Sequence, residues 1–398
     1  MNDHDTPHID DHPGHVRATW DDDRLARAHL SGVVEPASLD LARLVADHGA
    51  THVWGALQRG DAGKSRWSRL AGGFDLRASL ALCPRDDLRY VVPTDEDWPA
   101  GLQALAHVEH EGLGGAPLGL WVLGPQRPDE VLAGSVAVVG SRAATHYGQQ
   151  VAAALGAELS AAGRTVVSGG AYGIDAAAHT GALVGPGTTA AILAHGLDQW
   201  YPRGNHQLLE QVSRLGIACS EVAPGGTPTK VGFLGRNRLL AAVSTGTVLV
   251  EAAQRSGALN TVAWAHKLLR QVMAVPGPVT SALSLGPHRQ VRDGLAVLVT
   301  GAADVLDQVG SLQPELVPPA AAPRLLDLLD PTELAVREAL PGRGSRSVDD
   351  LAARTGFAVP EVLGSLTSLE AGGLARRRPD GSWALARPKG AAAVVTTT

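Results

Sequence analysis

The sequence has few of the residues that hold small or unusual folds together. Its 398 residues include only two cysteines, Cys83 and Cys219, which lie far apart and form no CxxC pair, so neither a disulfide scaffold nor a zinc site is indicated. We expect both to be reduced packing residues. Aromatic residues make up 4% of the chain and charged residues 19%, whereas 44% is hydrophobic. This composition predicts a folded protein with a sizeable core, divided into two or three domains.

Long hydrophobic runs are also missing. No stretch approaches the roughly 18 uninterrupted apolar residues that a transmembrane helix needs. The N-terminal stretch MNDHDTPHIDDHPGH is acidic, where a secretory signal would be basic and then apolar. Its histidines and aspartates favour a solvated tail over a metal site, because few apolar residues would anchor them. We therefore expect a cytoplasmic protein that makes no contact with membranes.

Charge is distributed unevenly along the chain. Residues 1–133 carry 12 basic and 21 acidic side chains, a net charge of −9, and residues 301–398 carry 10 and 12, a net charge of −2. Residues 134–300 carry 12 basic and 7 acidic side chains, so this segment alone is positive, at +5. A local excess of positive charge in an acidic protein indicates an anionic ligand bound at one site.

The same segment alternates between short β-rich runs and helical stretches. The predicted strands are VAVVG, RTVVSGG, TTAAILAHG, IACSEV, TVLVEA and RQVMAVPGP. Such alternation predicts right-handed βαβ units and an α/β fold, with a Rossmann-like parallel sheet covered on both faces. In sheets of this kind ligands bind beyond the carboxyl ends of the strands.

Small, hydroxyl and cationic residues follow these strands, as a phosphate site requires. Small residues let backbone N–H groups approach an anion, and arginine forks match phosphate oxygens. GSRAAT lacks the later glycines of GxGxxG, and residues 134–300 contain no GK[ST], which argues against hydride transfer and NTP hydrolysis. The predicted phosphate-binding residues are Gly140, Ser141, Arg142, Ser168, Gly169, Gly170, Gly173, Arg236, Asn237, Arg238, Ser256, Gly257 and Asn260.

A hydrolytic site is a weaker interpretation. Asp175 and His179 lie four residues apart on one predicted helix, Ser168 precedes them, and Glu251 ends a strand. However, Ser168 is not on a GxSxG elbow, and an acid and a histidine at this spacing are usually a local ion pair or a buried hydrogen bond. A metal site would lack a third ligand at a suitable spacing. We expect no catalytic residue, no metal and no cofactor.

The segments before and after the alternating core differ from it in composition. Leucines and alanines recur at helical spacing before it, and a proline- and alanine-rich stretch follows it. Beyond that come three helical segments and a hairpin turning at Asp380-Gly381, the order of a winged helix. The predicted divisions are a tail (1–20), a helical domain of the SAM or helix-hairpin-helix kind (21–92), the Rossmann-like core (93–310), a linker (311–324), the winged helix (325–388) and a tail (389–398).

The winged helix has no clear ligand from its sequence. Its third helix, PEVLGSLTSLEAGG, has no basic residue, whereas Arg376, Arg377 and Arg378 lie on the predicted wing. The third helix of a winged-helix domain can bind in the major groove of duplex DNA, usually with the support of basic side chains. Protein binding, duplex sensing and sequence-specific recognition therefore all remain open.

Several motifs together resemble the DprA (Smf) family of DNA-processing proteins. They are VAVVGSR, VVSGGAYGIDAAAHTGAL, AAILAHGLDQWYPRGN, SEVAPG, the RNR of FLGRNRLL, VLVEAAQRSGALNT and VMAVPGPV, in family order over about residues 95 to 310. The resemblance implies a bacterial protein that binds and protects single-stranded DNA, dimerises, and helps to load the RecA recombinase during natural transformation. It implies phosphate contacts for Arg142, and for Arg236 and Arg238 at a helix start.

Three departures from the family pattern affect these expectations. Tyr172 replaces a basic residue, FLGRNR replaces FPxRNR, and KLLRQV has a leucine where a glycine commonly precedes the arginine. Tyr172 is a candidate for stacking on a base, and packing on its own loop is the equal alternative. An alternative function is that of a Rossmann-like nucleotide phosphoribohydrolase using Glu251, although its PGGxGTxxE pattern is absent.

Overall fold

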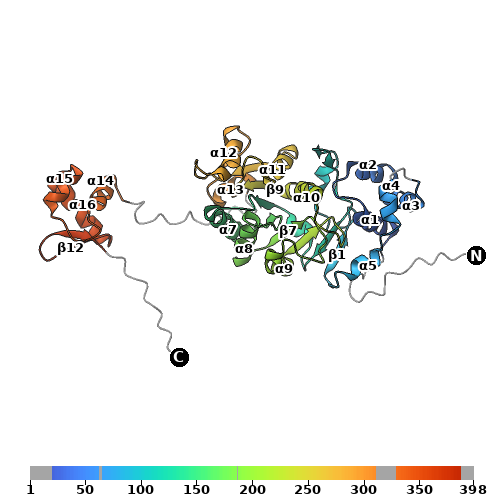
Figure 1. Cartoon of the computed structure of the whole chain (residues 1–398). Coiled ribbons are helices and arrows are strands. Elements are labelled where there is room, and N and C mark those ends of the chain that lie inside the picture. The colour runs from blue at the N-terminus through green and yellow to red at the C-terminus, as the bar shows by residue number, and fades with distance from the viewer. Residues whose placement is uncertain (1–19, 62–64, 186, 311–328, 387–398) are drawn as a thin grey trace, which may run out of the picture. The chain divides into compact units, whose positions relative to one another are not determined.

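The computed structural model describes residues 20–61, 65–185, 187–310 and 329–386. The chain divides into two compact units, residues 1–318 and 319–398, which are described separately (Figure 1). The predicted linker and C-terminal tail lie outside the described residues, as do residues 1–19 of the predicted N-terminal tail. No helix in the described ranges is long and apolar enough to cross a membrane.

A nine-stranded sheet is the centre of the first unit. Its order is β1-β4-β8-β7-β6-β5-β9-β10-β11; the strands from β8 to β11 are parallel, and β4 is antiparallel to both neighbours. The predicted α/β fold class is confirmed. The strands are β1 (Leu88–Val91), β4 (Leu120–Leu123), β5 (Ser135–Val139), β6 (Val166–Ser168), β7 (Thr189–Leu193), β8 (Ile217–Ser220), β9 (Ser244–Leu249), β10 (Gln271–Ala274) and β11 (Val297–Leu298).

Helices cover both faces of this sheet, so its central strands are apolar on both sides. The side chains of β5 alternate: Val136 and Val138 enter one core with α7, α8 and α13, whereas Ala137 and Val139 enter the other with α10 and α11. These helices are α6 (Pro128–Leu132), α7 (His146–Ala161), α8 (Ile174–Val184), α9 (His206–Leu215), α10 (Lys230–Val243), α11 (Ala258–Lys267), α12 (Leu285–Arg292) and α13 (Ala302–Val309). Two short strands, β2 (Glu109–His110) and β3 (Leu113–Gly114), form a separate hairpin.

Five helices form a small bundle at the start of the unit. They are α1 (Asp22–Val33), α2 (Leu39–His48), α3 (Ala50–Arg59), α4 (Ser65–Ala71) and α5 (Leu76–Ala81). Asp21, Ser38 and Asp75 cap three of them by accepting hydrogen bonds from the first-turn N–H groups. Leu30, Val53 and other apolar side chains of α1 to α4 fill one core, whereas Leu76 and Leu80 of α5 pack with β1 and β4.

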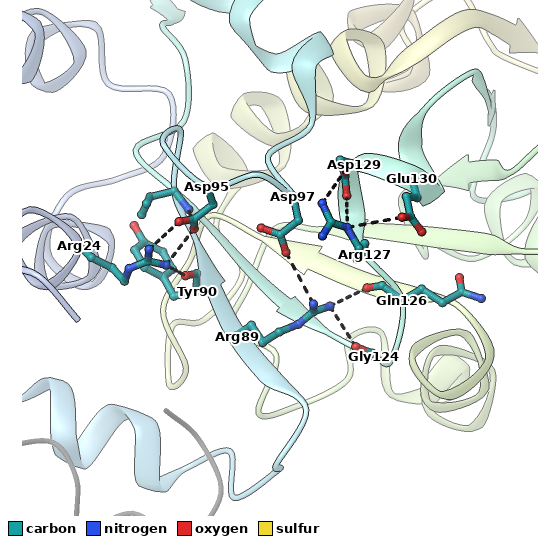
Figure 2. A network of polar contacts seen from close by, with 11 residues as sticks. Arg24, Arg89, Tyr90, Asp95, Asp97, Gly124, Gln126, Arg127, Asp129 and Glu130 are labelled. Atoms are coloured by element: carbon teal, nitrogen blue, oxygen red, sulfur yellow. Dashed lines mark hydrogen bonds and ion pairs between the residues drawn. The ribbon is translucent and has the colours of Figure 1, made fainter. Parts of the chain in front are cut away.

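Arg24 connects this bundle to the sheet. Its two terminal nitrogens donate to the two carboxylate oxygens of Asp95, at 2.8 and 2.6 Å, and one of them also donates to the carbonyl of Tyr90 on β1, at 3.0 Å (Figure 2). Asp95 in turn accepts from the N–H of Val92. Bidentate, charge-assisted pairs of this kind are strong and fix an orientation.

The second unit is a winged helix. Its helices are α14 (Pro331–Ala339), α15 (Val348–Thr355) and α16 (Val359–Ala371), followed by the hairpin of β12 (Ala375–Arg377) and β13 (Trp383–Leu385). Leu351, Leu366 and Trp383 are buried in its core. The side chains of α16 that reach solvent include Val359 and Leu363 but no cation, whereas Arg376 and Arg377 are exposed on β12.

The Arg24–Asp95 pair gives a stability prediction. Replacing Asp95 by Ala removes both bonds to Arg24 and the bond from Val92, so we expect unfolding free energy to fall by about 2 kcal/mol. Urea denaturation followed by circular dichroism measures this. Asp129→Ala is the matched control, because its exposed pair with Arg127 joins neighbours in sequence (Figure 2) and should contribute little to stability. Equal losses for the two variants would contradict the prediction.

Candidate anion-binding cleft

A cleft of about 680 Å³ opens at the carboxyl edge of the sheet. It lies beside β5, where the strand order reverses: β6, β7 and β8 continue to one side, and β9 and β10 to the other. The N–H of Ser141 donates to the carbonyl of Glu251 at 2.7 Å, which joins the ends of β5 and β9. This is the position in which doubly wound sheets bind ligands.

The cleft contains seven of the predicted residues and several others. The predicted residues along its wall are Gly140, Ser141, Arg142, Arg236, Asn237, Ser256 and Gly257. Thr229, Lys230, Phe233, Asp175 and Thr261 lie there as well. Its charged side chains are Arg142, Lys230, Arg236 and Asp175, so the wall carries a net charge of +2.

Arg142 is exposed on the loop between β5 and α7. Its guanidinium lies over the ring of Phe233, 4.9 Å from the ring centre. Within the described ranges, Arg142 donates a hydrogen bond to no other residue and forms no ion pair. A cation held in place by an aromatic face keeps all its N–H groups available for a ligand.

Two helix N-termini reinforce the positive potential. Helix α10 begins at Lys230, capped by the hydroxyl of Thr229, which accepts from the N–H of Gly232 at 2.9 Å. Helix α11 begins at Ala258, after Gly257, and has no side-chain cap. Thr229, Lys230, Gly257 and Ala258 all line the cleft. The first N–H groups of α11 already donate to Ser256 and Gly257, so the helix dipoles are what favours an anion at this end.

Arg236 is buried in the wall, with 6% of its surface exposed. Its Nη1 donates to the carbonyl of Gly169, at 2.9 Å, and to that of Ile192. A Cβ at Gly169 would lie 2.2 Å from Nη1 of Arg236, so any other residue there would displace this guanidinium. Burial lowers the pKa of Arg236 to about 10, which the charge of Asp175 partly opposes. Arg236 therefore remains cationic at neutral pH.

The structure corrects the prediction for Arg238. Helix α10 starts at Lys230, so Arg236 and Arg238 lie in its middle and not at its start. Residues two apart on a helix point in nearly opposite directions, and Arg238 faces away from the cleft. Its side chain is 1% exposed and pairs with both carboxylate oxygens of Glu221, at 2.5 and 2.6 Å, while its Nε donates to the carbonyl of Gly115.

The loop after β6 is also organised differently from the prediction. Its N–H groups at Gly169 and Ala171 donate to the carboxylate of Asp175, at 3.1 and 3.3 Å, and so do not line the cleft as free donors. The Ser168 hydroxyl donates to the carbonyl of Val138. Ser168, Gly170, Gly173 and Asn260 lie outside the wall of the cleft, although Asn260 accepts from Asn237 on it.

Tyr172 borders a smaller pocket that adjoins the cleft. This pocket, of about 80 Å³, also has Arg142, Gly169, His195, Tyr201 and Phe233 in its wall. The Tyr172 hydroxyl accepts from the N–H of Gly204 at 3.2 Å, and 47% of the residue remains exposed. The hydroxyl thus holds the side chain in place while much of it stays accessible.

The residues considered for catalysis have structural contacts. His179 is fully buried and its Nδ1 donates to the hydroxyl of Thr189, which in turn donates to a backbone carbonyl. Burial lowers the pKa of His179 to about 4, so it is neutral at pH 7. Glu251 is buried, and its two carboxylate oxygens accept from the N–H and the hydroxyl of Thr145 at the start of α7. The described residues contain no cluster of three or more metal-ligating side chains.

Sequence reasoning missed Lys230 and Phe233. The signal was present: GTPTK follows a predicted strand, and a threonine before a lysine and an apolar run marks a helix start. Taking Thr229 as the N-cap would have placed both residues in the first turn of α10, at the ligand edge of the sheet. The sequence places Asp175 on the helix that follows the loop. It does not show that the loop folds so that the N–H groups of Gly169 and Ala171 reach the Asp175 carboxylate.

Comparison with known proteins gives consistent results. Residues 89–310 match the model of the family described as DNA recombination-mediator protein A, and residues 318–381 match the DprA winged helix domain. A DNA processing protein DprA of Mycobacterium tuberculosis is 44% identical, over 91% of this chain and 94% of its own. Protein Smf of Escherichia coli is 36% identical, over 62% and 66%. The crystal structure of Streptococcus pneumoniae DprA aligns with a TM-score of 0.59 at 29% identity, covering 73% of this chain and 98% of its own.

The buried pair on the far side of α10 gives a second prediction. Arg238→Met leaves the Glu221 carboxylate buried without a partner, so we expect a loss of about 3 kcal/mol or more in unfolding free energy. Adding Glu221→Leu should restore most of it, since both charges are then replaced by apolar side chains. Urea denaturation of the single and double variants measures the difference. A double variant that is no more stable than Arg238→Met would show that the pair has another structural role.

Proposed function

This chain belongs to the DNA recombination-mediator protein A (DprA) family, and from that premise we propose that it binds single-stranded DNA in the cleft between β5, α10 and α11. The family acts in DNA processing and recombination. The observation that carries the proposal is a cleft with a net charge of +2, open at two helix N-termini, with an arginine that has no acceptor among the described residues. Phosphodiester groups fit this chemistry.

Each cationic side chain has a distinct part in this proposal. Arg142 contacts a phosphate with its free N–H groups, and Lys230 meets the backbone at the start of α10. Arg236 adds charge from within the wall, where its Nη2 has no acceptor among the described residues. Tyr172 stacks on a base next to the smaller pocket. Ser141, Asn237, Ser256 and Gly257 line the path of the strand.

The biological role follows from the family. We infer that the protein acts in the cytoplasm, protects incoming or exposed single strands, and helps to load the RecA recombinase during recombination and natural transformation. A binding protein needs no reacting group, and we propose that the chain is not an enzyme. The phosphoribohydrolase alternative would need a free glutamate, whereas Thr145 occupies both carboxylate oxygens of Glu251.

Binding is tested with labelled oligothymidine by fluorescence anisotropy at two salt concentrations. We expect Arg142→Ala to weaken binding by about tenfold at low salt and to flatten the dependence on salt, since one phosphate contact is lost. Tyr172→Ala in the same titration tests stacking. Arg214→Ala is the matched control, because Arg214 is exposed on α9 and pairs with Glu210. Equal affinities for wild type and Arg142→Ala would refute the cleft as the binding site.

We also propose that the protein is a homodimer through the β11 edge of the sheet. Strand β11 pairs with β10 on one side only, and its residues Val297 and Leu298 are 39% and 47% exposed. Leu295 and Leu285 nearby are also half exposed. An apolar sheet edge invites pairing with another chain, and a second copy supplies the same apolar surface.

The dimer is tested by sedimentation equilibrium. Leu298→Asp places a charge in the apolar edge without disturbing the buried core, so we expect a shift from dimer to monomer at micromolar concentration. Leu215→Asp, at an exposed leucine on the end of α9, is the control and should leave the mass unchanged. A dimer that persists in Leu298→Asp would place the interface elsewhere.

A further inference from the structure

We propose that Asp175 is the positioning residue of the cleft: its carboxylate is a built-in anion that fixes the 169–171 loop and opposes the DNA phosphate at Arg236. This inference rests on the proposed function. Asp175 then has two effects: it fixes the shape of the site, and it limits the affinity of the site for DNA.

The first part rests on hydrogen bonds. The Oδ2 atom of Asp175 accepts from the N–H groups of both Gly169 and Ala171, at 3.1 and 3.3 Å. These are the donors that would otherwise form an anion nest after β6. The nest is thus already occupied by a carboxylate of the protein. Asn205 holds the same loop from the other side, because its Nδ2 donates to the carbonyls of Gly170 and Ala171 at 3.0 and 3.1 Å.

The second part rests on charge. Asp175 is 6% exposed and lines the cleft, where its charge faces that of Arg236. The two form no direct ion pair, since Arg236 directs Nη1 to carbonyls and Nε to Asn237. A phosphate that approaches Arg236 must therefore also approach a carboxylate. Electrostatic forces at a site so poorly exposed to water are weakly screened, so this repulsion weakens binding.

A conservative substitution separates the two roles. Asp175→Asn keeps the side-chain size and an oxygen that accepts from both N–H groups, but removes the charge, so the wall of the cleft rises from +2 to +3. We expect oligothymidine affinity to increase about fivefold, and the gain should persist as salt rises, because the charge that is removed lies where screening is weak. Two matched controls are available. Asn205→Ala loosens the loop without changing charge and should weaken binding, and Glu210→Gln removes a charge on α9 outside the cleft and should leave affinity unchanged.

The outcomes distinguish the inference from the function on which it rests. Tighter binding by Asp175→Asn, with weaker binding by Asn205→Ala, supports the proposal. Binding by Asp175→Asn that is as weak as that by Asn205→Ala, or unchanged, overturns the opposing charge while leaving the cleft intact as the DNA site. Failure of wild type to bind oligothymidine at all overturns the proposed function and this inference together.

The wild-type chain provides the same test if Asp175→Asn does not fold. Arg236 on α10 acts on the charge of Asp175, Arg142 lines the same cleft, His179 lies one turn along α8, and His195 lines the adjoining pocket. Burial raises the pKa of Asp175 and lowers that of both histidines. As pH falls through the raised pKa, the carboxyl becomes neutral, and affinity should rise. Exposed histidines also become charged as pH falls and strengthen binding to any DNA, and a duplex of equal length measures this contribution. An equal rise in affinity for the single strand and the duplex overturns the proposal.

Discussion

A buried guanidinium is the constraint on which the rest of the site depends. An arginine in a protein interior must direct its N–H groups to acceptors, because their desolvation is otherwise too costly. Arg236 meets this need with the carbonyls of Gly169 and Ile192, at the ends of two adjacent strands. The path of the backbone after β6, the glycine at 169 and the carboxylate of Asp175 all follow from that choice. One side of the cleft therefore carries the positive charge of Arg236, which these hydrogen bonds hold in place.

Helix α10 shows how one element serves two surfaces. Arg236 and Arg238 are two residues apart, so one faces the cleft and the other faces Glu221 and the carbonyl of Gly115. The first is incompletely neutralised and remains available to an anion, whereas the second is fully engaged within the protein. Two arginines on one helix thus have different roles: Arg236 supports binding of an anion, and Arg238 supports stability.

The fold could be predicted further than the site. Alternating β-rich and helical runs located β5 to β10, since each run is nearly uniformly apolar and bounded by turn residues. Strands β1 and β11 were not predicted. LRYV pairs antiparallel with β4 and lies outside the alternation of strands and helices, and Val297–Leu298 is too short to show a pattern. Within the site, the predicted residues after β5 line the cleft, whereas Ser168, Gly170 and Gly173 at and after the end of β6 do not. Errors arose where a helix start was misjudged, as for Arg238, and where a side chain bonds a loop that sequence alone cannot bring to it, as for Asp175.

The fit between Gly169 and Arg236 has a consequence for how this sequence can change. A methyl group at 169 would occupy the space of the guanidinium, so each position limits what the other accepts. A change at 169 becomes tolerable only after 236 has shortened, and a shorter side chain at 236 abandons two backbone carbonyls. The two positions are therefore coupled: a side chain at 169 displaces the guanidinium that donates to the carbonyls of Gly169 and Ile192.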